Sequence, residues 1–461
     1  MKGLRANVVI CGAGIAGVSA AYHLAVKKGV KEVVLVDEHP PLTLTSDKST
    51  EAYRNWWPGP GTTMVDFMNR SIDLLEELAC ESDNYFHLNR RGYVFLTTDP
   101  DHVPTMERSA VEISQLGAGQ LRYHYGRSDD PPYPPFIARG FDPQLTGADV
   151  VLDAALIGKH HPFITNQVVA MVHPRRCGWL SAQQLGMYLL EQAKEHGVRF
   201  LRGRVTDVTL VNGRIESVHV SAPTGPLQIS TRTFVIGAGP LLKQAGAMIG
   251  IDFPVFNELH GKVAFDDTLG IVLRDAPLMI WDDPVLLPWT EEEREDLAAK
   301  EETRWLLEEF PGGVHFRPEG GLGSQTLLVL WPYHIEAQEP TWPPPFEPEY
   351  GEIAIRGLAR MIPGLSAYLS KMPRPVVDGG YYCKTQENRP LIGCLPVKGA
   401  YVIGALSGFG IMASMAAGEL LASHVTGGEL PDYAPAFLLG RYEDPDYRKL
   451  LEHWDATSGQ L

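Results

Sequence analysis

A polar run at residues 44–61, LTSDKSTEAYRNWWPGPG, carries side chains suited to ligand binding near the start of the chain. Its hydroxyl groups and backbone N–H groups can line an extended polar ligand; the hydroxyl residues are Thr45, Ser46, Ser49 and Thr50. Arg54 can hold a carboxylate through two parallel hydrogen bonds. Trp56 and Trp57 can wall such a site, although both also fit a protein core and Arg54 also fits a surface salt bridge. The residues before this run distinguish a ligand strip from an ordinary loop.

Those residues form a pattern typical of dinucleotide binding. An apolar strand at 8–11 enters a glycine turn, and a helical stretch and a second strand at 33–36 follow. Gly12 permits the tight turn, Gly14 lets the backbone approach a pyrophosphate, and Gly17 lets the helix pack on the sheet. Asp37, twenty residues after Gly17, can accept hydrogen bonds from ribose hydroxyls. A glycine-rich surface turn would not require this order, so we predict a dinucleotide site. Ile15, Ala16 and Glu38 complete the predicted set.

NAD and FAD share this fingerprint, and the polar run at 44–61 separates them. Nicotinamide dehydrogenases usually continue with further strand and helix units at this point. Here the chain enters a hydroxyl-rich strip instead, which suits an extended flavin. The sequence therefore favours FAD.

With these features the chain resembles the D-amino-acid oxidase superfamily of FAD enzymes, in particular its sarcosine oxidase, glycine oxidase and dimethylglycine dehydrogenase branch. The resemblance extends over most of the chain. Besides the fingerprint it is carried by CGWLSAQQLGMYLLEQAKEHGVRFLRGRVTDVTLVNGRIESVHV (177–220), TFVIGAGP (233–240), GGYYCKTQENRPLIG (379–393) and YVIGALSGFGIMASMAAGELLASHVTG (401–427).

The resemblance implies an α/β fold with a discontinuous, Rossmann-like FAD-binding domain at 1–84, 170–250 and 376–461. A substrate domain of the α+β kind, built on a mixed sheet, would occupy 85–169 and 251–375. Val205 would contact the adenine through its backbone, and Gly237 and Gly239 would leave room for the cofactor. A glycine loop and the helix after it would face the flavin pyrimidine ring, where a helix N-terminus stabilises negative charge on reduced flavin. Its residues are Gly408, Gly410, Ile411 and Met412.

Three departures from sarcosine oxidases bear on the chemistry. Met412 stands where those enzymes have a lysine that helps to bind carboxylate, and Val329 matches a lysine that promotes reaction with oxygen. The cysteine that attaches flavin covalently would fall at Gly380, three residues before Cys383. We therefore expect non-covalent FAD, and the sequence leaves oxidase and dehydrogenase both open.

The implied reaction oxidises the C–N bond of an amino acid or of a secondary or tertiary amine, with hydride transfer to flavin N5 and hydrolysis of the resulting imine. Arg54, eight residues after Ser46, resembles the carboxylate-binding arginine of sarcosine oxidases. His260, Lys262 and Tyr381 are further candidates to line the pocket, and each also fits a structural role. Two alternatives stay open, an NAD(P)H-dependent flavin reductase or monooxygenase and a flavin-binding subunit that has lost catalysis.

Composition indicates the partners and the compartment. The formal net charge of −16 repels polyanions, so nucleic acid is not expected. The five cysteines are scattered without metal or disulfide spacing, which predicts no metal site and a cytoplasmic protein. Glycines interrupt the first apolar run before it forms a signal segment, and no apolar stretch reaches the ~20 residues that span a bilayer. The expected partners are a small amine or amino acid and oxygen or another electron acceptor, in an oligomeric state that the sequence leaves open.

Two stretches look like surface elaborations. Residues 290–310 predict an acidic amphipathic helix that Thr290 caps. Its buried face would comprise Leu297, Trp305, Leu306 and Phe310. Residues 339–351 predict a stiff, proline-rich loop. Both are read as solvated elements, with a lid or a subunit contact as the alternative.

Overall fold

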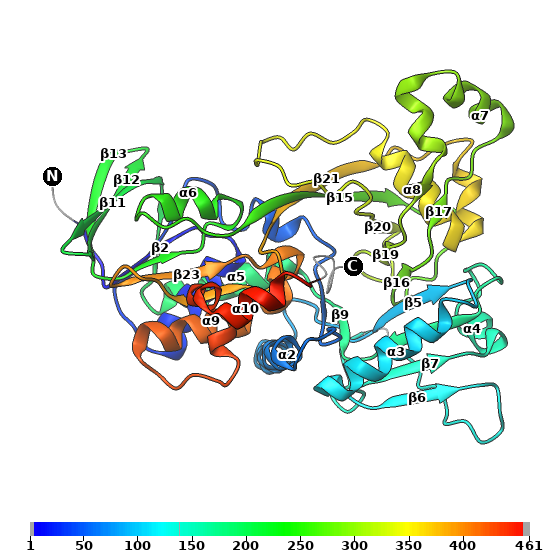
Figure 1. Cartoon of the computed structure of the whole chain (residues 1–461), viewed down its shortest axis with the longest axis horizontal. Helices are drawn as coiled ribbons and strands as arrows, with labels where there is room; N and C mark the ends of the chain where they lie inside the picture. The colour runs from blue at the N-terminus through cyan, green and yellow to red at the C-terminus, as the bar shows by residue number, and fades with distance from the viewer. Residues whose placement is uncertain (1–3, 138, 455–461) are drawn as a thin grey trace.

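Two large sheets organise the chain in the computed structural model, which describes residues 4–137 and 139–454. A six-stranded sheet with its helices occupies the left half of Figure 1, and a nine-stranded sheet occupies the right half. The long strands β15 and β21 run from the middle of the molecule into the right half. This arrangement confirms the predicted α/β class with a Rossmann-like part and a mixed sheet.

The six-stranded sheet has the order β10-β3-β2-β14-β23-β22, and all neighbouring pairs except β22 with β23 are parallel. Its strands, in chain order, are β2 (Val8–Cys11), β3 (Val33–Asp37), β10 (Arg199–Arg202), β14 (Phe234–Ile236), β22 (Leu391–Cys394) and β23 (Ala400–Gly404). The central strands read as apolar runs because helices cover a parallel sheet on both faces. Segments far apart in the sequence therefore build one sheet, as expected for a discontinuous domain.

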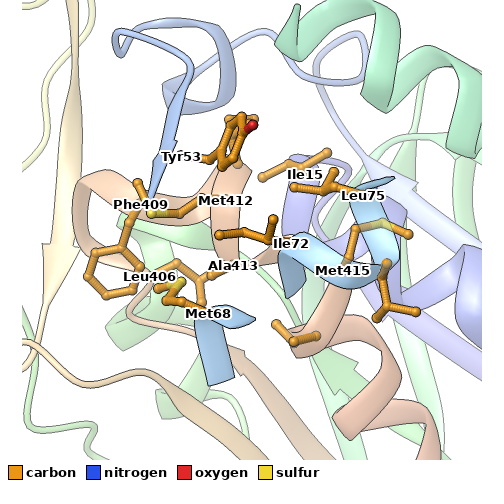
Figure 2. Packing of buried hydrophobic residues seen from close by; sticks show 14 of the residues in the cluster. Ile15, Tyr53, Met68, Ile72, Leu75, Leu406, Phe409, Met412, Ala413 and Met415 are labelled. Carbon is orange, nitrogen blue, oxygen red and sulfur yellow. The ribbon is translucent and has the colours of Figure 1, made fainter. Parts of the chain in front are cut away.

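Beside this sheet, helix α9 (Gly410–Thr426) packs against both α1 (Ile15–Tyr22) and α2 (Thr63–Glu81). Figure 2 shows Ile15 of α1, Ile72 of α2 and Met415 of α9 among the packed side chains. The small, apolar composition of α9 fits a helix that is buried on nearly all sides. This packing fixes the N-terminal ends of α1 and α9.

Smaller elements complete this half. A four-stranded sheet lies at the left end of Figure 1, with the order β1-β13-β12-β11. Its strands are β1 (Leu4–Arg5), β11 (Arg204–Val211), β12 (Arg214–Ala222) and β13 (Gly225–Ser230). The remaining helices of this half are α5 (Ala182–Glu195), α6 (Leu242–Ala247) and α10 (Pro445–Leu451). A short ribbon pairs β4 (Ala52–Arg54) with β9 (Cys177–Trp179).

The nine-stranded sheet is mixed and has the order β21-β15-β20-β19-β16-β5-β8-β7-β6. Its strands, in chain order, are β5 (Tyr93–Thr97), β6 (Leu121–His124), β7 (Ala148–Val151), β8 (Ala170–Pro174), β15 (Phe256–Asp266), β16 (Leu278–Trp281), β19 (Val314–Pro318), β20 (Thr326–Leu330) and β21 (Val376–Lys384). Its helices are α3 (Val103–Ile113), α4 (Ala154–His160) and α8 (Tyr350–Met361). Strands β8 and β21 open two of the segments proposed for FAD binding, yet they belong to this sheet. The division into two domains stays a proposal, and its residues 1–3, 138 and 455–461 lie outside the described part.

The acidic stretch at 290–310 does not form one helix, so that prediction is wrong. Helix α7 (Glu291–Ala298) begins with a capping box between Thr290 and Glu293, and a 3-10 helix follows at Glu301–Leu307. The Thr303 hydroxyl donates to the backbone oxygens of Leu297 and Lys300, which satisfies carbonyls that a continuous helix would use. Strand β18 (Glu309–Phe310) then pairs with β17 (Val285–Leu286). Among the described residues, no helix is both long and apolar enough to span a membrane.

Candidate active site

An open cavity of about 880 Å³ lies at the carboxyl ends of β2, β3, β14 and β23. This edge is where open α/β sheets bind ligands. Most of the predicted cofactor residues line it, namely Gly12, Gly14, Ile15, Ala16, Asp37, Thr45, Ser46, Ser49, Gly237, Gly239, Gly408, Gly410 and Ile411. Tyr381, predicted for the substrate pocket, lines this cavity as well. The fold thus brings predicted residues from both ends of the chain together in one cavity.

The glycine turn has no room for side chains at two of its positions. Gly12 adopts φ +108°, and a Cβ there would stand 2.2 Å from the backbone oxygen of Gly237. A Cβ at Gly17 would stand 1.9 Å from the oxygen of Gly12, so this residue packs the helix on the turn and does not line the cavity. Gly14 is less crowded, with Ser46 Oγ 3.3 Å from the Cβ position. The turn therefore requires glycine where the fingerprint predicts it.

Hydrogen bonds hold the polar strip, residues 45–49, in place beside the cavity. Asp37 accepts from the backbone N–H of Ala13 at 2.7 Å. Ser46 Oγ accepts from the N–H of Ile15 in the first turn of α1 at 2.9 Å, and it keeps its own hydrogen for donation. Thr45 Oγ1 donates to the backbone oxygen of Tyr381 at 2.9 Å. The strip therefore joins the glycine turn to β21.

Two of the predicted cofactor residues line a hollow separate from both cavities. Glu38, just after β3, and Val205, in β11, line a separate outer hollow together with Met248. The backbone hydrogen bond from Gly203 to the Asp37 oxygen holds the start of β11 beside the end of β3. The hollow therefore lies next to Asp37, the residue that is predicted to bind the ribose of the cofactor.

A second cavity of about 650 Å³ adjoins the first, because Tyr382, Ser407 and Gly408 line both. Strands β4, β5, β15, β19, β20 and β21 contribute to its walls, so it lies where the nine-stranded sheet meets the loop before α9. Arg54 and His260 line it as predicted. Thr50 and Met412, predicted to contact the cofactor, line this second cavity instead. Lys262 lines neither cavity, and its charge acts on Glu51.

Arg54 is the main cation of the second cavity. It ends β4 opposite Cys177 of β9, and only 5% of its surface is exposed. Its guanidinium carbon lies 4.7 Å from the ring centroid of Trp57. Trp56 and Trp57 both belong to the hydrophobic core, and of the two only Trp57 lines the cavity. Burial lowers the pKa of Arg54, yet a guanidinium stays charged at neutral pH. None of the described residues that line this cavity carries a carboxylate. Arg54 therefore gives this cavity a permanent positive charge that can bind an anionic group.

Two imidazoles share the cavity with Arg54. The His260 Nε2 lies 3.2 Å from Glu258 Oε2, and the ring stacks on Tyr382 with centroids 4.0 Å apart. Burial lowers the pKa of His260. His315 Nδ1 donates to the backbone oxygen of Gly313 at 2.9 Å, and burial lowers its pKa to about 4. Both rings are therefore neutral at neutral pH.

Sequence reasoning missed several residues of this cavity. They include Tyr93, His315, Leu330, Tyr382, Ser407 and Phe409. Within the described part of the chain, the hydroxyls of Tyr93 and Ser407 are buried without a hydrogen-bond partner, so they are available to a ligand. Ser407 stands inside the glycine loop that was singled out, and its φ of +46° is unusual for a serine. For Tyr93 and His315, which come from unrelated strands, no local signal existed.

The positions that depart from sarcosine oxidases are also clear. Val329 is fully buried in a hydrophobic cluster, while its neighbour Leu330 lines the second cavity. A Cβ at Gly380 would stand 3.1 Å from Thr45 Cα. Cys383 lines the first cavity, and burial raises the pKa of its thiol to about 12. This thiol is therefore protonated at neutral pH and a poor nucleophile.

The first cavity fits an FAD molecule. A glycine turn leads into a helix N-terminus, a carboxylate follows the second strand, and a second helix N-terminus after Gly408 borders the same space. These features define a dinucleotide-binding protein. Residues 7–424 match the family model of DAO, the FAD dependent oxidoreductases. The chain belongs to this family, which confirms the predicted family, the enzyme class and the FAD cofactor.

Relatives and solved structures agree with this assignment. Dimethylglycine dehydrogenase, mitochondrial, from Mus musculus is 24% identical over 437 residues, which are 93% of this chain and 43% of that protein. The chain thus spans less than half the length of this relative. L-proline dehydrogenase from P. horikoshii superposes with a TM-score of 0.71 at 19% identity, covering 98% of this chain and 100% of the other. Glycine oxidase from Bacillus cereus gives a TM-score of 0.69 at 14% identity, covering 94% and 98%. The structural likenesses establish the shared fold.

Proposed function

We propose that this protein oxidises the C–N bond of an amino acid, or of a secondary or tertiary amine that carries a carboxylate. One observation carries the proposal: the buried guanidinium of Arg54 lines a cavity that adjoins the proposed cofactor cavity. A cation opposite the flavin edge would bind the carboxylate and hold the neighbouring C–H toward the cofactor. The names of three similar proteins, dimethylglycine dehydrogenase, L-proline dehydrogenase and glycine oxidase, support this substrate class.

In this proposal the first cavity binds the cofactor and the second cavity binds the substrate. FAD, when bound, supplies the hydride acceptor. The glycine turn, Asp37, the strip at 45–49 and the loop at 408–411 would hold it, without a covalent bond because glycine stands at position 380, where the attaching cysteine would fall. Arg54 would bind and orient the substrate. The rings of Trp57 and Phe409, which meet edge to face at 4.9 Å, would exclude water from it. We also propose a cytoplasmic location, which the five unpaired cysteines support.

The test is the visible spectrum of FAD-loaded protein, titrated anaerobically with glycine, sarcosine, N,N-dimethylglycine and L-proline. We expect at least one of them to bleach the flavin. Fast recovery of colour in air would identify an oxidase, and slow recovery with fast recovery by an added dye would identify a dehydrogenase. Bleaching by NADH or NADPH alone would favour the reductase alternative. A bound flavin that no amine or amino acid reduces would contradict the proposal.

A further inference from the structure

An amine substrate poses a proton problem in this cavity. At neutral pH an amino acid or alkylamine is an ammonium ion, whose nitrogen has no lone pair to stabilise positive charge at the neighbouring carbon when hydride leaves. A proton acceptor must therefore remove one N–H proton first. Among the described residues that line this cavity, Arg54 is cationic, and burial raises the pKa of Tyr93 and of Tyr382, so these phenols stay protonated. Two neutral imidazoles remain, His260 and His315.

We propose that His260 is the proton acceptor for the substrate ammonium, and that Glu258 and Lys384 are positioning residues that orient it and set its basicity. This proposal rests on the proposed amine oxidation. The three side chains are buried, and contacts link them in the order His260, Glu258, Lys384. His260 Nε2 lies 3.2 Å from Glu258 Oε2, and Lys384 Nζ lies 2.9 Å from Glu258 Oε2 and 3.1 Å from Oε1. At most 10% of each side chain is exposed.

The geometry fixes which nitrogen can accept. Nε2 faces a carboxylate and therefore carries the hydrogen, so the lone pair is on Nδ1. The Tyr382 ring, 4.0 Å away and nearly parallel, holds the plane of the imidazole. Both rings line the cavity that contains Arg54. A substrate with its carboxylate on Arg54 can thus present its ammonium group to a ring of fixed orientation.

His260 is better suited than His315 because only His260 is backed by a carboxylate. When Nδ1 takes a proton, the new positive charge is stabilised by Glu258 at hydrogen-bond distance. His315 instead donates to a backbone carbonyl, and both Arg54 and His260 act to lower its pKa further. His315 therefore accepts a proton less readily.

Lys384 reduces the basicity of His260. Burial raises the pKa of Glu258, but hydrogen bonds from His260 and Lys384 outweigh burial, so this pKa lies below its usual value. The Lys384 charge lowers the pKa of His260, against the effect of Glu258. The resting ring is consequently neutral and free to accept, while its carboxylate partner is kept ionised.

The proton transfer is balanced within the cavity. One N–H bond of the ammonium breaks, and its electron pair stays on the substrate nitrogen. One N–H bond forms at His260 Nδ1, which makes an imidazolium beside the Glu258 carboxylate. The substrate is then a neutral amine with an unchanged carbon skeleton, ready for oxidation.

The test is the pH dependence of flavin reduction by whichever of sarcosine, N,N-dimethylglycine or L-proline reduces the wild type fastest. We expect His260→Asn to lower the second-order rate constant roughly 100-fold at pH 7. The deficit should shrink steadily toward pH 10, because solution then supplies the neutral amine directly. Rate constants that stay in a fixed ratio from pH 6 to 10 would overturn the role of His260. A wild type that no amine or amino acid reduces would overturn the proposed function and this proposal together.

The positioning residues are tested by Lys384→Met. Titratable or charged groups around the ring are Arg54, Tyr93, Glu258, His315, Tyr382 and Lys384. Removing the Lys384 charge should raise the His260 pKa, seen by NMR of ¹⁵N-histidine-labelled protein and as an upward shift of the acid limb of the rate profile. An acid limb that stays in place or moves down would contradict the role of Lys384. If this variant does not fold, it is replaced by the double variant Glu258→Gln with Lys384→Met, which removes both charges. The acid limb of the rate profile should then still differ from that of the wild type.

A matched control is available. His102 Nε2 lies 3.1 Å from Asp282 Oδ2, which makes another histidine–carboxylate pair of the nine-stranded half. Neither residue lines the two cavities. His102→Asn should leave the pH profile unchanged, and a change like that of His260→Asn would show that loss of any such pair produces the effect, which would overturn the proposal.

Discussion

Gly408 and Tyr382 are in direct contact at the wall between the two cavities, where a Cβ at position 408 would stand 2.3 Å from Tyr382 Cε2. Both residues line both cavities, and the Tyr382 ring also stacks on His260. Because Gly408 has no side chain, the Tyr382 ring can lie where it stacks on His260. This contact joins the loop before α9 to the edge strand of the nine-stranded sheet.

We predict that Gly408→Ala slows flavin reduction and leaves FAD in place. The added methyl must push the Tyr382 ring, and misplacement of about 1 Å in an active site can cost roughly 100-fold in rate. Stopped-flow reduction with the best amine substrate measures the effect. Gly158→Ala is the control, because a Cβ in that part of α4 meets no atom within 4 Å. Equal rates for both variants would show that the contact has no catalytic weight.

Arg54→Gln should weaken transition-state binding of a carboxylate substrate by about 2–4 kcal/mol through loss of charged hydrogen bonds. This corresponds to a fall in kcat/KM of about 30- to 1,000-fold. Arg54→Lys keeps the charge without the planar fork, so it should retain an intermediate value. Steady-state kinetics on a carboxylate substrate and on a matched amine without a carboxylate check the assignment. If both substrates lose the same factor, Arg54 does not bind the carboxylate.

Most residues proposed from the sequence for the cofactor line one cavity, because the sequence signals for them are local. Gly12, Gly14 and Asp37 belong to one strand–turn–helix–strand unit, whose spacing follows from backbone geometry. Of the residues that line the second cavity, Arg54 and His260 are those that the sequence proposed for the substrate. Tyr93 and His315 come from β5 and β19, which meet this cavity through pairings in a nine-stranded sheet that no short pattern specifies. Lys262, proposed for the same pocket, lines neither cavity, because its neighbours in the sequence do not reveal how far along β15 the second cavity extends.

A stability prediction concerns Glu387, whose side chain is fully buried. Its Oε1 accepts from Arg441 Nη2 at 2.7 Å, from Tyr442 at 2.8 Å and from Tyr447 at 2.9 Å. Glu387→Ala leaves the Arg441 charge buried without its carboxylate, which should cost about 3–5 kcal/mol of unfolding free energy. Urea unfolding measures it.

The control for this prediction is an exposed ion pair between Arg232 and Glu216. Glu216→Ala should change the free energy of unfolding by less than about 1 kcal/mol. A loss for Glu387→Ala no larger than that of Glu216→Ala would mean that the buried cluster does not stabilise the C-terminal segment.

Acid should destabilise the fold at a pH where carboxylates are still ionised. Burial lowers the pKa of His23 to about 4 and that of His161 to about 3, both below the ordinary value of 6.5. Below pH 6.5 the unfolded chain therefore binds protons that the folded chain does not. The unfolding free energy is fully retained above pH 6.5 and falls as the pH drops toward 4, by about 1.4 kcal/mol per pH unit for each such histidine.

His23→Gln should reduce this slope by about 1.4 kcal/mol per pH unit, because the variant lacks one of the groups that take a proton only on unfolding. The measurement is urea unfolding at several pH values between 4.5 and 6.5, in wild type and variant. His196→Gln, at an exposed position after α5, is the control and should keep the wild-type slope. A His23→Gln slope that equals the wild-type slope would mean that His23 takes up its proton in the folded chain as readily as in the unfolded one.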